Sequence, residues 1–240
     1  MGADIHFYVE NKQGDQWVSA DKWFKDEDDG SMSLYDWGPG FKVKSGPMYS
    51  ERNYDVFAML ANVRNGHGFA GVNTGEGFVP IHEPRGVPED ASENVKLSNE
   101  RWDCDGHSHS WATVEELMAY DWTRKTKKRG WVSSKQFARW HLDGRPEFWS
   151  GGIGGGGIEH ISNIEMMAHL LSLAEGDKFN WQDYHKMKER DFGIGETIYT
   201  QVEWEVSYYE SASNFLSETM PKLWKIGKPS EVRCVYWFDN

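Results

Sequence analysis

The first residues of the chain alternate between apolar and polar side chains, and this alternation constrains the fold more than any other stretch. The apolar residues occupy every second position: Ala3, Ile5, Phe7 and Val9. Side chains of a strand alternate between the two faces of a sheet, so residues 3–10 predict a strand with one buried face. Residues 231–238 predict a second, aromatic-rich strand two residues before the chain stops. We therefore expect both terminal strands in one sheet.

The chain between these strands carries the start and stop signals of helices. Thr113 and Glu116 have the spacing of a capping box, and Pro88 precedes two acidic residues, as in a first helical turn. Helices are expected over residues 54–64, 88–102, 114–120, 134–141, from 163 onward, and over 209–226. Pro221 should kink or end the last of these helices.

Composition agrees with a packed fold. Aromatic residues make up 15% of the 240 residues, which is enough for a core and unlike a disordered chain. No convincing linker divides the elements. We predict an α+β fold with a single domain over residues 1–240, in which a mixed β-sheet including both terminal strands is surrounded by helices and long loops.

Charge argues against duplex nucleic acid as a main partner. The formal net charge is −12, whereas a duplex-binding protein presents a basic face. The basic run at residues 124–129 is expected to be a solvated turn between helices, with a phosphate-binding patch as the alternative. The pattern specifies no oligomeric state.

The cysteines and the hydropathy indicate a cytoplasmic protein. Cys104 and Cys234 are the two cysteines and form no Cys-x-x-Cys pair, so a four-cysteine zinc knuckle is excluded. The start lacks the basic and apolar regions of a secretory signal, and no stretch approaches eighteen apolar residues. We expect neither export nor a membrane partner.

Residues 102–111 hold the densest set of chemically active side chains. In an extended segment His107 and His109 would point the same way. We predict His107, His109 and Asp105 as catalytic residues, and a divalent metal as the one cofactor indicated. The candidate metal ligands are Asp4, His6, Asp103, His107 and His109. The alternative is a tight loop whose histidines bond to backbone and whose tryptophans fill the core.

Two of these patches resemble blocks of the metallophosphoesterase family. The patches are Asp4-Ile5-His6 and Gly106-His107-Ser108-His109. The resemblance implies a dinuclear metal centre that activates water and binds a phosphate. It covers about seven residues, the family's intervening blocks are not evident, and over half of the chain follows the second block. The alternative for Asp4 and His6 is a polar strand face.

A glycine-rich loop at residues 151–157 is a candidate anion site. Gly154, Gly155 and Gly156 lie in it, and a helix is expected from Ser162. Such a loop can turn several N–H groups inward, and a helix N-terminus favours an anion. The Lys-Ser/Thr ending of a P-loop is absent. A hinge, a lid or a packing turn is the alternative.

Two arginines in short turns complete the candidate binding residues. Arg52 precedes a helix and Arg85 lies between Pro84 and Pro88, and either could bind a phosphate or carboxylate. Arginines of this kind more often bond loop carbonyls. Trp102 and Trp111, together with Trp149, could stack on the base of a nucleotide.

Several blocks together resemble a family of uncharacterised bacteriophage-encoded proteins. They are residues 2–6 (GADIH), 52–57 (RNYDVF), 84–88 (PRGVP), 105–111 (DGHSHSW) and 236–240 (YWFDN). The resemblance spans nearly the full length and implies a phage protein acting in the cytoplasm of an infected bacterium, where a counter-defence role is plausible by context.

Three functions are therefore expected in order. The first is binding, with hydrolysis as an option, of a small phosphorylated ligand such as a nucleotide signal. The second is an acidic, Trp-rich inhibitor that covers a basic site on a host defence protein and has no small ligand. The third is a metal-dependent phosphoesterase-like hydrolase. Ligand-induced stabilisation distinguishes the first from the second.

Overall fold

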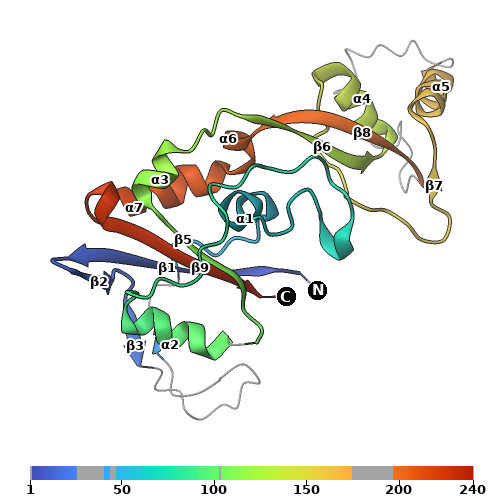
Figure 1. The fold of residues 1–240 in the computed structure, drawn as a ribbon. Coiled ribbons are helices and arrows are strands. Elements are labelled where there is room, and N and C mark those ends of the chain that lie inside the picture. The colour runs from blue at the N-terminus through green and yellow to red at the C-terminus, as the bar shows by residue number, and fades with distance from the viewer. Residues whose placement is uncertain (1, 26–40, 44–46, 103, 175–196, 240) are drawn as a thin grey trace. The chain divides into compact units, whose positions relative to one another are not determined.

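The computed structural model describes residues 2–25, 41–43, 47–102, 104–174 and 197–239 (Figure 1). Contacts divide the chain into two compact units. The first unit comprises residues 1–65, 78–123 and 209–240, and the second comprises residues 66–77 and 124–208. The single-domain prediction over residues 1–240 stays a prediction. No helix among the described residues has the length and apolar character needed to cross a membrane.

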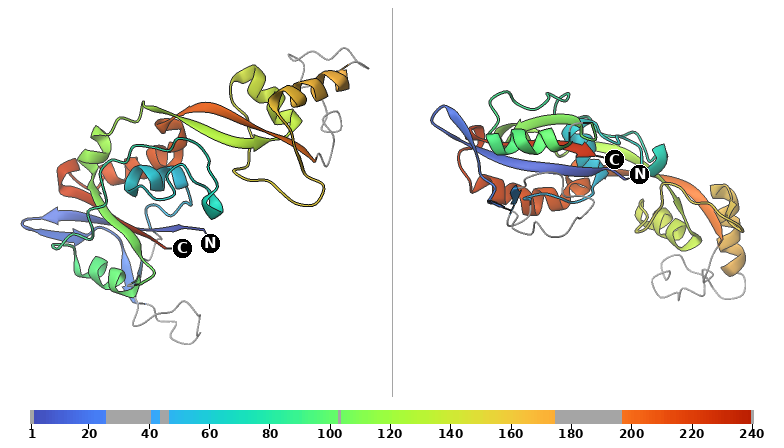
Figure 2. Two further views of the ribbon diagram at one scale, coloured as in Figure 1. Left: turned by 45° about the vertical axis from the view of Figure 1, so that its right-hand side comes forward. Right: turned by 90° about the horizontal axis from the view of Figure 1, so that it is seen from below.

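The first unit is built on a four-stranded antiparallel sheet that contains both terminal strands. Its order is β2 (Gln16–Ser19), β1 (Asp4–Gln13), β9 (Val232–Asp239) and β5 (His107–Thr113). The two chain ends accordingly lie side by side in all views (Figures 1 and 2). The α+β fold and the position of both terminal strands in one sheet are confirmed. The same unit holds the short pair β3 (Trp23–Lys25) and β4 (Phe41–Val43).

One face of this sheet packs against α1 (Tyr54–Ala61). Phe57 of α1 contacts Phe238, with ring centroids 4.9 Å apart, and Tyr236 donates a hydrogen bond to the Leu60 carbonyl. Helix α1 ends at Ala61, three residues before the predicted end. Asn62 takes a left-handed conformation (φ 60°) and its N–H bonds back to the Ala58 carbonyl, which terminates the helix.

The opposite face packs against α2 (Glu93–Trp102), which Figure 1 shows across the β1–β9 pair from α1. Val95 of α2 packs on Trp237. The prediction that this helix opens at Pro88 is wrong. The Asp90 carboxylate accepts a hydrogen bond from Arg233, and the Ser92 N–H donates to the Glu10 carboxylate. These contacts hold residues 88–92 as a turn, so the helix begins at Glu93.

One of the remaining helices of this unit begins at its predicted capping box. Thr113 and Glu116 form the predicted capping box of α3 (Val114–Ala119). The predicted helix over residues 209–226 is three pieces: α6 (Tyr208–Ser211), a π-helix (Phe215–Thr219) and α7 (Met220–Trp224). Pro221 lies in the first turn of α7, where its missing N–H is tolerated, so it neither kinks nor ends that helix. A 3-10 turn (Pro229–Glu231) leads into β9.

The second unit has a smaller sheet in which β6 (Lys125–Val132) pairs antiparallel with β8 (Ile198–Ser207). β7 (Glu159–His160) adds in parallel, so the mixed strand pairing occurs here. Helices α4 (Ser134–Asp143) and α5 (Asn163–Ala174) pack on it. Their core is Val132, Phe137, Ala138, Met166, Leu170, Val202 and Trp204. A 3-10 turn (Phe69–Gly71) also belongs to this unit.

Residues 125–129 of the basic run lie in β6, so the predicted turn between helices is wrong. The side chains of these residues alternate, and the exposed ones meet acids on neighbouring segments. Arg129 pairs with Glu203, Lys125 with Glu205, and Lys127 with Glu76, the last at 3.8 Å. These pairs offset the positive charge that a phosphate-binding patch would need.

Candidate functional site

Antiparallel pairing brings the predicted residues of three strands to one end of the first unit's sheet. Asp4 of β1 lies opposite Asp239 of β9, and His6 lies opposite Trp237. β5 begins at the same end, where His107 lies opposite Phe238. We call the polar residues gathered here the strand-end cluster; they are Asp4, His6, Arg52, His107, His109 and Asp239.

Asp4 and Arg52 form a two-point ion pair at the edge of this cluster. Arg52 Nε donates to Asp4 Oδ1 at 2.8 Å, and Arg52 Nη2 donates to Asp4 Oδ2. The hydrogen bonds from Arg52 lower the pKa of Asp4. Both side chains are about half exposed, with 52% for Asp4 and 54% for Arg52. Both Asp4 oxygens therefore face a guanidinium. A carboxylate that ligates a metal would instead turn an oxygen toward the ion.

His6 is enclosed by aromatic rings. Its centroid lies 4.0 Å from Trp102 and 5.9 Å from Trp237, and its Nε2 lies 3.4 Å from Asp239 Oδ2. Burial lowers the pKa of His6, although Asp239 opposes the shift, so the imidazole is mainly neutral at pH 7. The predicted stacking residue Trp102 thus packs on a histidine of the cluster.

Two ring nitrogens at this point lack a hydrogen-bond partner among the described residues. They are Nε2 of His6, whose 3.4 Å contact with Asp239 Oδ2 lacks hydrogen-bond geometry, and Nε1 of the fully buried Trp237. A buried N–H that is left unpaired costs free energy, so native structures rarely keep one without reason. Of the eight buried side-chain atoms without a partner among the described residues, these two lie beside the strand-end cluster.

His107 and His109 do not lie on the same side of the sheet, so the prediction from strand alternation is wrong. His107 pairs with Phe238 and Ser110 pairs with Tyr236, so β5 advances three residues where β9 advances two. The additional residue in β5 is a bulge. Ser108 carries it with φ 54°. A one-residue slip moves a side chain to the other face.

The two imidazoles consequently contact neighbouring residues of β9 that face opposite ways. The His107 ring lies 6.2 Å from Phe238, whereas the His109 ring stacks 5.6 Å from Trp237. Burial lowers the pKa of both histidines, and the charge of Arg64 lowers that of His107 further against the pull of Asp239. Both rings are half-buried and mainly neutral at pH 7.

The other predicted ligands of a metal do not complete a site among the described residues. No group of three His, Cys, Asp or Glu side chains there could hold a metal ion. Asp103 lies outside the described residues. Asp105 is exposed in the turn that follows α2, where its N–H bonds to the Trp102 carbonyl.

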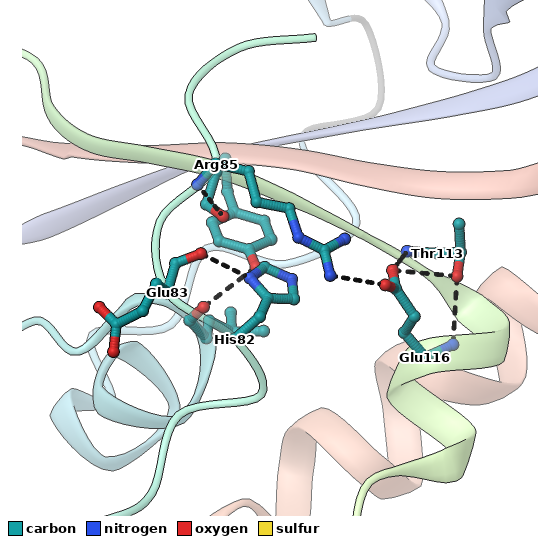
Figure 3. Close-up of polar contacts among 8 residues, drawn as sticks. His82, Glu83, Arg85, Thr113 and Glu116 are labelled. Carbon is teal, nitrogen blue, oxygen red and sulfur yellow. Dashed lines mark hydrogen bonds and ion pairs between the residues drawn. The ribbon is translucent and has the colours of Figure 1, made fainter.

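Arg85 lies in a different contact network, which fastens its loop to the free edge of β5 (Figure 3). Arg85 Nη2 donates to Glu116 Oε1 at 2.7 Å, and its guanidinium lies 4.8 Å over the ring of Trp111. The Arg85 backbone N–H donates to Ser110 Oγ at 3.2 Å. His82, beside it, bonds through Nδ1 to the Glu83 carbonyl. Arg85 and Trp111, both predicted to bind ligand, thus contact each other.

The glycine loop belongs to the second unit. Gly155 has φ 139°, and a Cβ added at Gly154, Gly155 or Gly156 would meet no other atom within 4 Å, so the loop is open. The expected start of α5 is confirmed as a reciprocal pair of Ser162 and Glu165. The Glu165 carboxylate already accepts the Ser162 N–H at 2.8 Å, so this helix end carries its own anion.

Sequence reasoning missed Asp239 and Trp237. Asp239 contacts His6, and Trp237 separates His6 from His109 in the row of rings. The aromatic ending predicted a strand, but only its register against β1 reveals that Trp237 faces His6. That register could have been proposed by placing the polar ends of the two terminal strands together.

No model of a known protein family, no curated protein and no solved structure matches the chain.

Proposed function

We propose that the strand-end cluster binds a small phosphorylated ligand such as a nucleotide. The observation that carries the proposal is the pair of buried ring nitrogens on His6 and Trp237 that lack partners among the described residues. An indole N–H can only donate, so its natural partner is an acceptor such as a phosphate oxygen. The site lies where a guanidinium and two further imidazoles are also within reach of solvent.

The cluster offers several kinds of contact to such a ligand. Trp237 and the neutral imidazole of His6 supply N–H groups, and Arg52 supplies a half-exposed cation. Trp102 presents an indole at the end of α2, next to His6, on which a base could stack. His107 and His109 flank β9 from its two faces. Neutral imidazoles also suit proton transfer, so hydrolysis is to be assayed together with binding.

Calorimetry with a panel of linear and cyclic nucleotides, pyrophosphate and inorganic phosphate tests the proposal. Trp237→Phe removes the N–H and keeps an aromatic ring, so affinity should fall at least about tenfold, or about 1.4 kcal/mol. Trp111→Phe makes the same change on the neighbouring strand β5 and should leave affinity unchanged. Thermal unfolding of both variants shows that each is folded at the temperature used. Absence of binding by the unaltered protein across the panel overturns the proposal.

A second candidate function, an inhibitor of a host protein, is favoured by a separate observation. Several large apolar side chains of the described residues are exposed, among them Trp224 at 55% and Phe148 at 69%. Exposed aromatic residues are typical anchors of protein interfaces. This candidate expects no stabilisation by any nucleotide, and loss of counter-defence activity in infected cells on Trp224→Ala.

A further inference from the structure

We infer that the strand-end cluster selects singly charged phosphodiesters over doubly charged phosphomonoesters. The inference rests on the proposed function and specifies its ligand class. It follows from the charged side chains that lie around the imidazoles, above all the Asp239 carboxylate 3.4 Å from His6 Nε2.

The charges that act on the cluster are two carboxylates and two guanidiniums. Asp4 and Asp239 act on His6, Arg52 binds Asp4, and Arg64 acts on His107 alongside Asp239. The imidazoles add little charge at pH 7 because burial disfavours their protonated form. The guanidinium of Arg52 is already committed to Asp4 at two points.

A ligand that carries one negative charge matches this arrangement. Its charge can be stabilised by neutral N–H donors, Trp237 Nε1 and an imidazole nitrogen, and by the exposed side of Arg52. A phosphomonoester carries a charge of roughly −1.5 to −2 near neutral pH, because its second pKa is about 6. The additional charge would be repelled by Asp4 and Asp239, and Arg52 is already bound to Asp4.

Asp239 makes this second charge especially unfavourable. Its Oδ2 is 3.4 Å from His6 Nε2, so a phosphate oxygen that accepts a hydrogen bond from that nitrogen must lie close to the carboxylate. The Asp239 side chain is about one-fifth exposed, so water screens the repulsion incompletely. The carboxylate tolerates one bound negative charge better than two.

Matched pairs of ligands test the inference by calorimetry at pH 8 and fixed low salt. Adenosine 3′,5′-cyclic monophosphate should bind at least about tenfold more tightly than adenosine 5′-monophosphate. Dimethyl phosphate should exceed methyl phosphate in the same direction, which separates charge from the base. Comparing the affinity of the dinucleotide adenylyl-adenosine with that of the cyclic nucleotide shows whether a linear or a cyclic phosphodiester binds more tightly.

Asp239→Asn provides the decisive variant. Removing that carboxylate should strengthen binding of the monoester. The ratio of diester affinity to monoester affinity should fall at least about threefold. Asp15→Asn removes the same charge from the exposed turn between β1 and β2, at the far end of β1, and should leave the preference unchanged.

The outcomes separate this inference from the function on which it rests. Equal or tighter binding of the monoester, or a preference that Asp239→Asn does not narrow, overturns the charge selection while phosphorylated-ligand binding stands. Failure of every ligand, the cyclic nucleotide and the dinucleotide included, overturns the proposed function itself.

Discussion

The two ends of the β1–β9 pair carry charged side chains on the same sheet face, but they differ in how those side chains are satisfied. At one end Asp4 and Asp239 lie opposite each other, and His6 and Trp237 keep orphaned nitrogens. At the other end Glu10 lies opposite Arg233, and Arg233 Nε donates to the Glu10 carboxylate at 2.7 Å, although Arg233 Nη2 also lacks a partner among the described residues.

This difference distinguishes a candidate site from a structural network. Glu10 is fully buried, and Arg233 is 2% exposed and lies 4.1 Å over the ring of Trp17. Asp90 binds the same guanidinium. Buried charges that are paired within the fold serve packing, whereas half-exposed charges remain accessible to solvent and are the better candidates for a ligand site.

The largest expected effect comes from breaking the Glu10–Arg233 pair. Arg233→Ala leaves the buried Glu10 carboxylate without its cation and should cost about 3–5 kcal/mol of unfolding free energy. Urea denaturation measures it. Replacing both partners, Glu10→Leu with Arg233→Met, should restore most of the loss because the desolvation penalty disappears with both charges. A loss below about 1 kcal/mol in the single variant would contradict the structural role given to this pair.

Asp21, beside the same network, should make stability depend on pH. Burial raises its pKa to about 6, although the Val9 N–H bonds to the carboxylate. The folded pKa is above the unfolded one, so the stabilisation from protonated Asp21 is complete below about pH 4 and is lost as pH rises through 6. The loss is about 3 kcal/mol.

Asp21→Asn is the measurement for this prediction. Asparagine can still accept the Val9 N–H but cannot ionise, so unfolding free energies of the two proteins should converge at low pH and diverge in favour of the variant above pH 6. Parallel pH profiles would show that Asp21 titrates normally and that this end of the sheet is less enclosed than its contacts indicate.

The sequence predicted the alternation of β1 and the presence of both terminal strands in one sheet, but it could not tell the two ends of β1 apart. Asp4, His6 and Glu10 occupy equivalent positions in one polar-face pattern. Which of them is enclosed depends on partners remote in sequence, such as Arg233 and Asp239, and therefore on register. Local patterns cannot encode it.

The bulge in β5 was equally hidden from the sequence. Ser108 takes a positive φ without being glycine or asparagine, so no residue type announces it. The Thr113–Glu116 box and the helix cap at Ser162 were predicted because the contacts of such caps span only three residues. The start of α2 was missed because its turn is held by Glu10 and Arg233, more than eighty residues away in sequence.

Truncating side chains of the strand-end cluster should affect ligand affinity more than stability, whereas truncating the Glu10–Arg233 pair should affect stability. His107→Ala with His109→Ala removes two half-buried rings and should cost only about 1–2 kcal/mol of stability, while nucleotide affinity falls at least about tenfold. Calorimetry measures the affinity and urea denaturation measures the stability of the same samples. His169→Ala, a half-buried histidine of the second unit, serves as the control. A loss of several kcal/mol without any ligand bound by the unaltered protein would make these histidines structural.

The smallest effect on stability is expected at Arg52, the exposed counterpart of Arg233. Both arginines bind a carboxylate of β1, but the Asp4–Arg52 pair is about half exposed, and exposed ion pairs contribute roughly 0–1 kcal/mol. Arg52→Met should therefore leave the unfolding free energy nearly unchanged, because water solvates the Asp4 that remains. Affinity for a cyclic nucleotide should nonetheless fall several-fold, and more at low salt than at high salt, because a half-exposed cation is screened by added ions. Calorimetry at two salt concentrations measures the affinity, and urea denaturation measures the unfolding free energy. If Arg52→Met destabilises the protein as much as Arg233→Ala does, the two ends of the pair serve the same structural purpose, and the distinction between them fails.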